Sequence, residues 1–144
     1  MKHLQNRLII EGDLPLLLIF LKENKILDSE KFMPLEIQLK KAIMMFQDQV
    51  ILDLYDYKKK IAKWYLEHLG CTNSLKIILN YSKDRNILTS FFDSFEDSPQ
   101  LFIKFLSKKY PHFKFYLYWN KPYANHFELD FFAYFQNGKD LVLF

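Results

Sequence analysis

Hydrophobic and polar positions repeat along the chain with two different periods, and the changes of period mark its elements. Leu4–Ile10 has the dense apolar character of a short strand. The leucines of Leu14–Leu21 recur at helical spacing and predict a helix that ends near Asn24. Asp13 stands where an N-cap is expected, and Pro15 suits the first helical turn. The chain therefore begins with a strand followed by a helix.

The middle of the chain has mainly helical periodicity. Ile26–Pro34 fits neither period and is predicted to be an irregular connection. Leu35–Phe46 and Asp53–Leu69 each place apolar residues on one stripe and are predicted helices. Gly70 follows the second helix at the position of a C-terminal cap. The other side of that helix carries a group of lysines, which are Lys58, Lys59, Lys60 and Lys63.

Two strands and another helix follow. Leu75–Tyr81 and Asn86–Phe92 are predicted strands on either side of a polar turn. Asp93–Ser98 is predicted to be an acidic loop. Ser98 is expected to cap the helix Leu101–Tyr110, with the following proline in the first helical position.

The C-terminal part of the chain predicts three further strands, Phe113–Trp119, Phe127–Phe135 and Leu141–Phe144. Because side chains alternate between the two faces of a strand, one face of the first two strands carries large apolar residues suited to a core. The opposite face carries a second aromatic set with charged neighbours. This set is Tyr116, Tyr118, Phe132 and Tyr134, with Lys114, Glu128 and Asp130. Such a mixture is typical of a binding face or of a hydrated contact between elements.

This order of strands and helices is typical of an α+β protein. The simplest assembly is a ferredoxin-like antiparallel sheet with two helices on one face. Residues 1–144 then form a single domain, in which residues 26–70 are a helical insertion.

Composition and charge narrow the class of protein. Half of the 144 residues are hydrophobic and 18% are aromatic, which excludes a disordered chain. The net charge of +3 permits an acidic partner without requiring one. Cys71 is the single cysteine, so no internal disulfide forms and a reducing cytoplasm is the expected location. The apolar run Leu14–Leu21 is too short to span a bilayer and lacks the flanks of a signal peptide.

The chain lacks the common sequence signatures of catalysis, metal binding and cofactor binding. The chain has no GxSxG, no phosphate-cradling glycine loop, no HExxH and no CxxC pair. Its four histidines lack the spacing of metal ligands. A dyad of Cys71 with His68 is a weaker interpretation than a passive thiol at a helix end. We therefore expect a protein that is not an enzyme and that needs no metal or cofactor.

Three groups of residues remain as candidates for binding. The first group is acidic and has three interpretations. Glu96 and Asp97, with Asp93, are a general acid/base pair, favourable charges at a helix N-terminus, or a loop that imitates nucleic-acid phosphate. The lysines of the second middle helix either bind a phosphate backbone or form a solvated helix face. The second aromatic face either stacks bases or is covered, by the helices of residues 35–69 or by a protein partner.

The chain resembles a known family in four places, in the same order. Asn6–Gly12 is similar to the N-terminal NRLTIxG signature of YubB-like proteins, which are carried on plasmids, phages and genomic islands. Leu27–Pro34 resembles the LDFxKIxPMP segment of that family. Phe95–Gln100 echoes TAWSPP, and Leu106–Pro122 echoes LSEKYPxLxFxLYYxEP. The resemblance implies a ferredoxin-like fold and a mobile-element origin, but no activity.

The chain also departs from this family at three places. Asp97 stands where the family has Trp, and Gln100 stands where the family has a second Pro. Pro122–Phe127 replaces a glycine-rich PGMGFAG turn. If those family residues form a shared pocket, this chain has lost it and uses the scaffold differently.

Together these observations predict a non-enzymatic protein that binds another macromolecule. The mobile-element origin that the resemblance implies favours an inhibitor of a host defence system, of the anti-CRISPR type, that acts by protein–protein contact. The predicted contact residues are Asp93, Glu96, Asp97, Tyr116, Tyr118, Phe132 and Tyr134. One alternative is a single-stranded RNA-binding module that uses the aromatic face, with the lysines from Lys58 to Lys63 as phosphate contacts. Another is a toxin-neutralising immunity protein.

Overall fold

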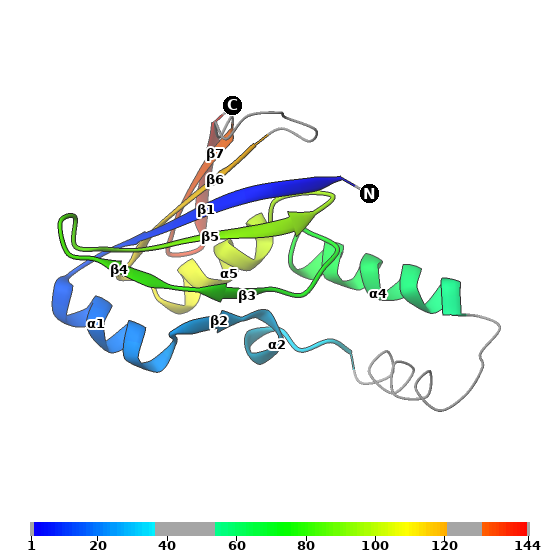
Figure 1. The fold of residues 1–144 in the computed structure, drawn as a ribbon, viewed down its shortest axis with the longest axis horizontal. Helices are drawn as coiled ribbons and strands as arrows, with labels where there is room; N and C mark the ends of the chain where they lie inside the picture. The colour runs from blue at the N-terminus through cyan, green and yellow to red at the C-terminus, as the bar shows by residue number, and fades with distance from the viewer. Residues whose placement is uncertain (1, 37–53, 121–130, 144) are drawn as a thin grey trace.

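The computed structural model describes residues 2–36, 54–120 and 131–143, and these residues form an α+β structure, as predicted (Figure 1). The elements are β1 (His3–Glu11), α1 (Leu14–Glu23), β2 (Ile26–Asp28), α2 (Ser29–Phe32), α4 (Leu54–His68), β3 (Lys76–Ile78), β4 (Asn80–Ser82), β5 (Ile87–Phe95), α5 (Gln100–Lys109), β6 (Lys114–Trp119), β7 (Phe131–Gln136) and β8 (Lys139–Leu143). None of the described helices is long and apolar enough to cross a membrane.

Most strands form one antiparallel sheet with β1 near its centre. The strand order is β4-β5-β1-β6-β7-β8, and a separate two-stranded sheet pairs β2 with β3. β1 pairs along its whole length with β5 and over its second half with β6. Because β1 has neighbours on both edges, its position fixes the register of the strands around it.

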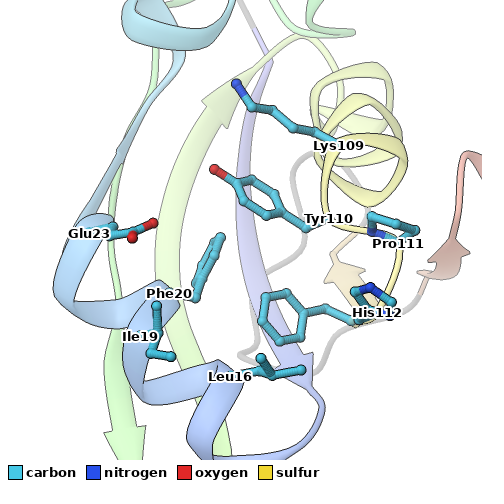
Figure 2. Close-up of a pocket in the computed structure, with 9 residues that line it drawn as sticks. Leu16, Ile19, Phe20, Glu23, Lys109, Tyr110, Pro111 and His112 are labelled. Carbon is cyan, nitrogen blue, oxygen red and sulfur yellow. The ribbon is translucent and has the colours of Figure 1, made fainter.

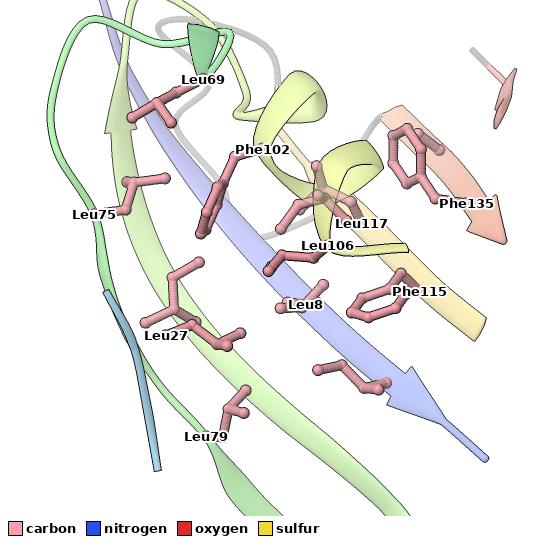
Figure 3. Packing of buried hydrophobic residues seen from close by; sticks show 14 of the residues in the cluster. Leu8, Leu27, Leu69, Leu75, Leu79, Phe102, Leu106, Phe115, Leu117 and Phe135 are labelled. Atoms are coloured by element: carbon pink, nitrogen blue, oxygen red, sulfur yellow. The ribbon is translucent and has the colours of Figure 1, made fainter. Parts of the chain in front are cut away.

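The core lies on one face of the large sheet. The even-numbered residues of β1 are buried there, whereas its odd-numbered residues are exposed or half-buried. Helices α1 and α5 and the small sheet lie on this same side (Figure 1). Figure 3 shows the packing of side chains from β1, α5 and β6, among them Leu8, Phe102, Leu106, Phe115 and Leu117. Each is fully buried, and such burial stabilises the fold by roughly 1.5–3 kcal/mol per side chain.

The expectations for the middle of the chain need correction. Ile26–Pro34 is not an irregular connection, because it contains strand β2 and the short helix α2. The predicted strand Leu75–Tyr81 is two strands, since the backbone N–H of Leu79 donates to Lys25 and the chain changes sheets at this point. The predicted helix Leu35–Phe46 lies outside the described residues apart from Leu35 and Glu36, which are not helical.

The strand before α5 is longer than predicted. β5 continues to Phe95, so Asp93 is a strand residue and not part of a loop. Its register continues because Asp93 lies opposite Gln5 and Phe95 lies opposite His3 on β1. The polar character of Asp93 suggested a loop, but an exposed position on one face of a strand accommodates a charged side chain equally well.

The helix ends agree with the sequence only in part. Asp13 occupies the N-cap position of α1, but its side chain makes no capping hydrogen bond. Gly70 follows α4 with a φ of 94°, which confirms the predicted glycine cap. Ser98 was expected to cap α5, whereas the cap residue is Pro99. The Ser98 hydroxyl instead donates to Asn6 Oδ1 at 2.8 Å.

A buried polar network centred on Asn6 explains this different use of Ser98. Asn6 faces the core and is 1% exposed, and its amide nitrogen donates to Ser94 Oγ at 2.8 Å. The Ser94 hydroxyl donates onward to the backbone carbonyl of Asp97 at 2.7 Å. The network therefore ties β1 to β5 and to the segment that leads into α5. Every buried partner is satisfied, which makes such a network stabilising.

We predict that Asn6→Ala and Ser98→Ala each lower the free energy of unfolding by about 1–3 kcal/mol, because each leaves a buried polar partner unsatisfied. The double variant is expected to lose less than the sum of the two losses, since the residues share one hydrogen bond. Urea unfolding of the four proteins measures this coupling. Asn80→Ala, at an exposed site on edge strand β4, is the control and should change stability by less than about 0.5 kcal/mol. Additive losses would show that Asn6 and Ser98 act independently.

Candidate functional site

The face of the large sheet opposite the core carries the predicted aromatic set. No helix that the structure describes lies over this face (Figure 1), and we call it the uncovered face. Its residues include His3, Gln5, Arg7, Ile9 and Glu11 of β1, Thr89, Phe91, Asp93 and Phe95 of β5, Lys114, Tyr116 and Tyr118 of β6, Phe132, Tyr134 and Gln136 of β7, and Lys139 of β8.

Strand pairing arranges part of this face as a row across four strands. Arg7 lies opposite Phe91 on one side and opposite Tyr118 on the other. Tyr118 in turn lies opposite Phe132, and their ring centroids are 4.9 Å apart. We call Phe91, Arg7, Tyr118 and Phe132 the aromatic row. Its four members come from four different strands, and β1 is far in the sequence from β5, β6 and β7.

A second row runs beside the first. Ile9 lies opposite Thr89 and Tyr116, and Tyr116 lies opposite Tyr134 with ring centroids 5.2 Å apart. The Tyr116 ring also stacks on Phe132 at 6.1 Å, which joins the two rows. The structure thus brings all four predicted aromatic residues together. Each is only half-buried, and the contacts among their rings account for part of that burial.

Arg7 and Phe91 belong to this site although they were not among the predicted residues. The guanidinium carbon of Arg7 lies 5.4 Å from the centroid of the Phe91 ring, within cation–π range. Phe91 is 73% exposed, the largest value among the exposed large hydrophobic residues. The pair Phe91-Phe92 carried a signal for this, because two adjacent residues of a strand point to opposite faces. One of the two phenylalanines had to face away from the core.

The three predicted acidic residues have different positions. Asp93 lies on the uncovered face, where its carboxylate is 3.2 Å from His3 Nε2. Glu96 has a φ of 69°, and its carboxylate accepts from the backbone N–H of Lys2 at 3.0 Å. Asp97 Oδ1 accepts from the backbone N–H of Ser98 at 2.7 Å. Two of the three carboxylates thus accept hydrogen bonds from backbone N–H groups. Of the three, only Asp93 lies on the face of the aromatic residues.

Charges on the uncovered face are mixed. Arg7, Lys114 and Lys139 supply positive charge, and Glu11 and Asp93 supply negative charge. Burial raises the pKa of Tyr116, and the Glu11 carboxylate raises it further. The Tyr116 hydroxyl therefore stays neutral and able to donate a hydrogen bond at physiological pH. Glu128 and Asp130, which were expected on this face, lie outside the described residues.

The predicted lysine cluster lies elsewhere on the molecule. The four lysines lie within α4 and are exposed: Lys58, Lys59, Lys60 and Lys63. This helix packs into the core through Tyr65, and Leu69 directly after it is also buried there, on the side of the sheet that the helices cover. The structure therefore does not bring the lysines and the aromatic residues onto one surface.

A separate cavity of about 210 Å³ lies between α1 and the turn after α5 (Figure 2). The rings of Phe20, Tyr110 and Phe113 contact one another there, with Phe20 edge-on to both partners. Leu16 and Ile19 of α1 border the cavity and are exposed. This lining suits an apolar group, and it was not predicted.

The proposed pairing of Cys71 with His68 does not form a nucleophilic site. Cys71 is fully buried and its thiol donates to the carbonyl of Asn73 at 3.4 Å. His68 Nδ1 lies 2.8 Å from the carbonyl of Trp64, and its ring stacks on that indole. Burial raises the pKa of Cys71 to about 11, which disfavours the reactive thiolate. Within the part of the chain that the structure describes, no group of three or more His, Cys, Asp or Glu side chains is placed to hold a metal ion.

Comparison with known proteins adds no identification. No family model matches the chain, and neither curated proteins nor solved structures gave a match. The case for a function therefore depends on the geometry of the uncovered face.

We predict that Cys71 makes stability sensitive to alkaline pH. Its pKa rises from an ordinary value of 9.0 to about 11 in the fold, so the unfolded chain loses the proton first as the pH rises. The free energy of unfolding should therefore be unaffected by this thiol below pH 9 and fall by about 2 kcal/mol as the pH rises to 11. Urea unfolding at several pH values measures the slope. The Cys71→Ala variant should have a shallower slope, and identical slopes would contradict the prediction.

Proposed function

We propose that the protein is a non-enzymatic binding module that contacts another protein through the uncovered face. The aromatic row carries this proposal, because it crosses four strands on a face that no described helix covers. Phe91 is 73% exposed and presents apolar surface that a partner would remove from water on covering it.

The residue types of the aromatic row support a protein partner. Tyr, Phe and Arg are enriched at the centres of protein–protein interfaces, where they supply much of the binding energy. At a strand spacing of about 4.8 Å, the row extends roughly 15 Å from β5 to β7. That width suits the centre of an interface of ordinary size, which buries about 800 Å² per partner.

Single-stranded RNA is the second candidate, since tyrosine and phenylalanine rings on an open sheet are suited to base stacking. The charges favour a protein over RNA. RNA binding requires several cations along the phosphate backbone, whereas on the described part of the face Glu11 and Asp93 offset two of the three cations Arg7, Lys114 and Lys139. The α4 lysines, which would add positive charge, are on the covered side of the sheet.

For the biological role we propose an inhibitor of a bacterial host defence system, of the anti-CRISPR type, that acts in the cytoplasm. The resemblance of Asn6–Gly12 and of the three later segments to YubB-like proteins of mobile elements supports this role. We also propose that β1, β4, β5 and β6 with α1 and α5 are a ferredoxin-like core extended by β7 and β8. The strand order β4-β5-β1-β6 and the placement of both helices on one face support that relationship. A toxin-neutralising immunity protein is the remaining alternative.

A panel of purified CRISPR effector complexes tests the proposal by biolayer interferometry. We expect the wild-type protein to bind one of them, and we expect Phe91→Ala and Tyr118→Ala each to weaken that binding by about 5–30-fold, as at interface hot spots. Leu18→Ala is the matched control, because Leu18 is an exposed apolar residue on α1, away from both the uncovered face and the cavity beside α1. Circular dichroism checks that each variant folds.

A labelled single-stranded RNA, measured at two salt concentrations, separates the two candidates. RNA binding that weakens steeply with salt and depends on Tyr118 would favour the RNA-binding module. Effector binding that Phe91→Ala and Tyr118→Ala leave unchanged would contradict the assignment of the uncovered face.

A further inference from the structure

Two polar atoms on the uncovered face lack hydrogen-bond partners. Among the described residues, Arg7 Nε and Thr89 Oγ1 are the buried side-chain nitrogen and oxygen atoms without one. They lie on neighbouring strands, since Arg7 pairs with Phe91 and Thr89 pairs with Ile9, two residues further along β1. Buried polar groups in folded proteins are almost always paired, so an unpaired one needs an explanation.

The surroundings of Arg7 supply no counter-charge. Within residues 2–36, 54–120 and 131–143 its guanidinium takes part in no ion pair or hydrogen bond, and its recorded contact is the Phe91 ring. Asp93, the acidic residue next to Phe91 on this face, is 3.2 Å from His3. Glu11, the other acid, is four residues from Arg7 along β1. The arginine therefore presents unused donors between two aromatic side chains.

A guanidinium in this setting is suited to a planar anion. Its N–H groups form a rigid fork that matches the two oxygens of a carboxylate. Phe91 and Tyr118 lie opposite Arg7 on its two sides and supply apolar surface beside the guanidinium.

We propose that the Arg7 guanidinium, with Phe91 and Tyr118 beside it, forms a seat for a carboxylate, carried by an Asp or Glu side chain of the protein partner that has apolar neighbours. This inference rests on the proposed function and names the chemistry of the partner. A carboxylate is favoured over an RNA phosphate because the seat holds a single cation and the rest of the described face adds no net positive charge.

The arginine side-chain signals in NMR test the seat directly. The chain contains two arginines, Arg7 and Arg85, so the Nε–Hε region of a ¹⁵N spectrum holds two resonances. Arg85 is exposed in the turn between β4 and β5 and serves as an internal reference. The probe is the blocked tripeptide Phe-Glu-Phe, and Phe-Gln-Phe is its uncharged match.

We expect Phe-Glu-Phe to shift the Arg7 signal in a saturable way and to leave the Arg85 signal unchanged, and Phe-Gln-Phe to shift neither. Arg7→Lys should weaken peptide binding by about tenfold or more, because an ammonium lacks the planar fork. Lys114→Gln, which removes another cation of this face, should have little effect. Equal shifts of both arginines, or a shift of Arg7 with oligouridine and none with Phe-Glu-Phe, would overturn the proposal.

Binding to the effector panel separates failure of the seat from failure of the proposed function. If Phe91→Ala and Tyr118→Ala weaken effector binding while Arg7→Gln does not, the uncovered face is the interface and the carboxylate seat is wrong. A seat that acts in the interface requires Arg7→Gln to weaken binding at least tenfold more than Lys114→Gln, since both variants remove one positive charge.

Discussion

The buried hydrogen bonds of Asn6 are the constraint on which the rest of the structure depends. Asn6 lies in the central strand with its side chain in the core, and its amide is satisfied by Ser94 and Ser98. A slip of one residue between β1 and β5 would leave these buried groups unpaired and would turn the apolar residues of β1 outward. The network therefore holds the register. It also places the next residue, Arg7, opposite Phe91 and Tyr118 on the other face.

The two faces of the sheet have different roles, although both are rich in aromatic residues. The core face is closed by α1, α5 and the small sheet, and its large side chains are fully buried. The uncovered face combines half-buried rings with Arg7 and with charges of both signs. Phe91 contributes little to folding where it lies, because most of its surface remains in water. A side chain of this kind is better explained by recognition than by stability.

Local sequence patterns were sufficient where an element depends mainly on its own residues. The periodicities of α1, α4 and α5, the apolar run in β1 and the alternation in β6 predicted those elements to within a few residues. The pattern failed where a distant segment decides the structure. β2 exists because β3 pairs with it, and Ser98 serves Asn6 instead of capping α5. Neither partner is visible in a local window of sequence.

The candidate site divides in the same way. The sequence alone predicted that Tyr116, Tyr118, Phe132 and Tyr134 share a face, because side chains alternate along each strand and the more apolar set of each strand was assigned to the core. It also indicated that Phe91 or Phe92 faces away from the core. Only the tertiary structure decided that Arg7 lies between Phe91 and Tyr118, that Asp93 joins this face, and that the α4 lysines do not. The physical reason is that strand order and register are set by hydrogen bonds between distant segments, and a row across four strands exists only after those strands have paired.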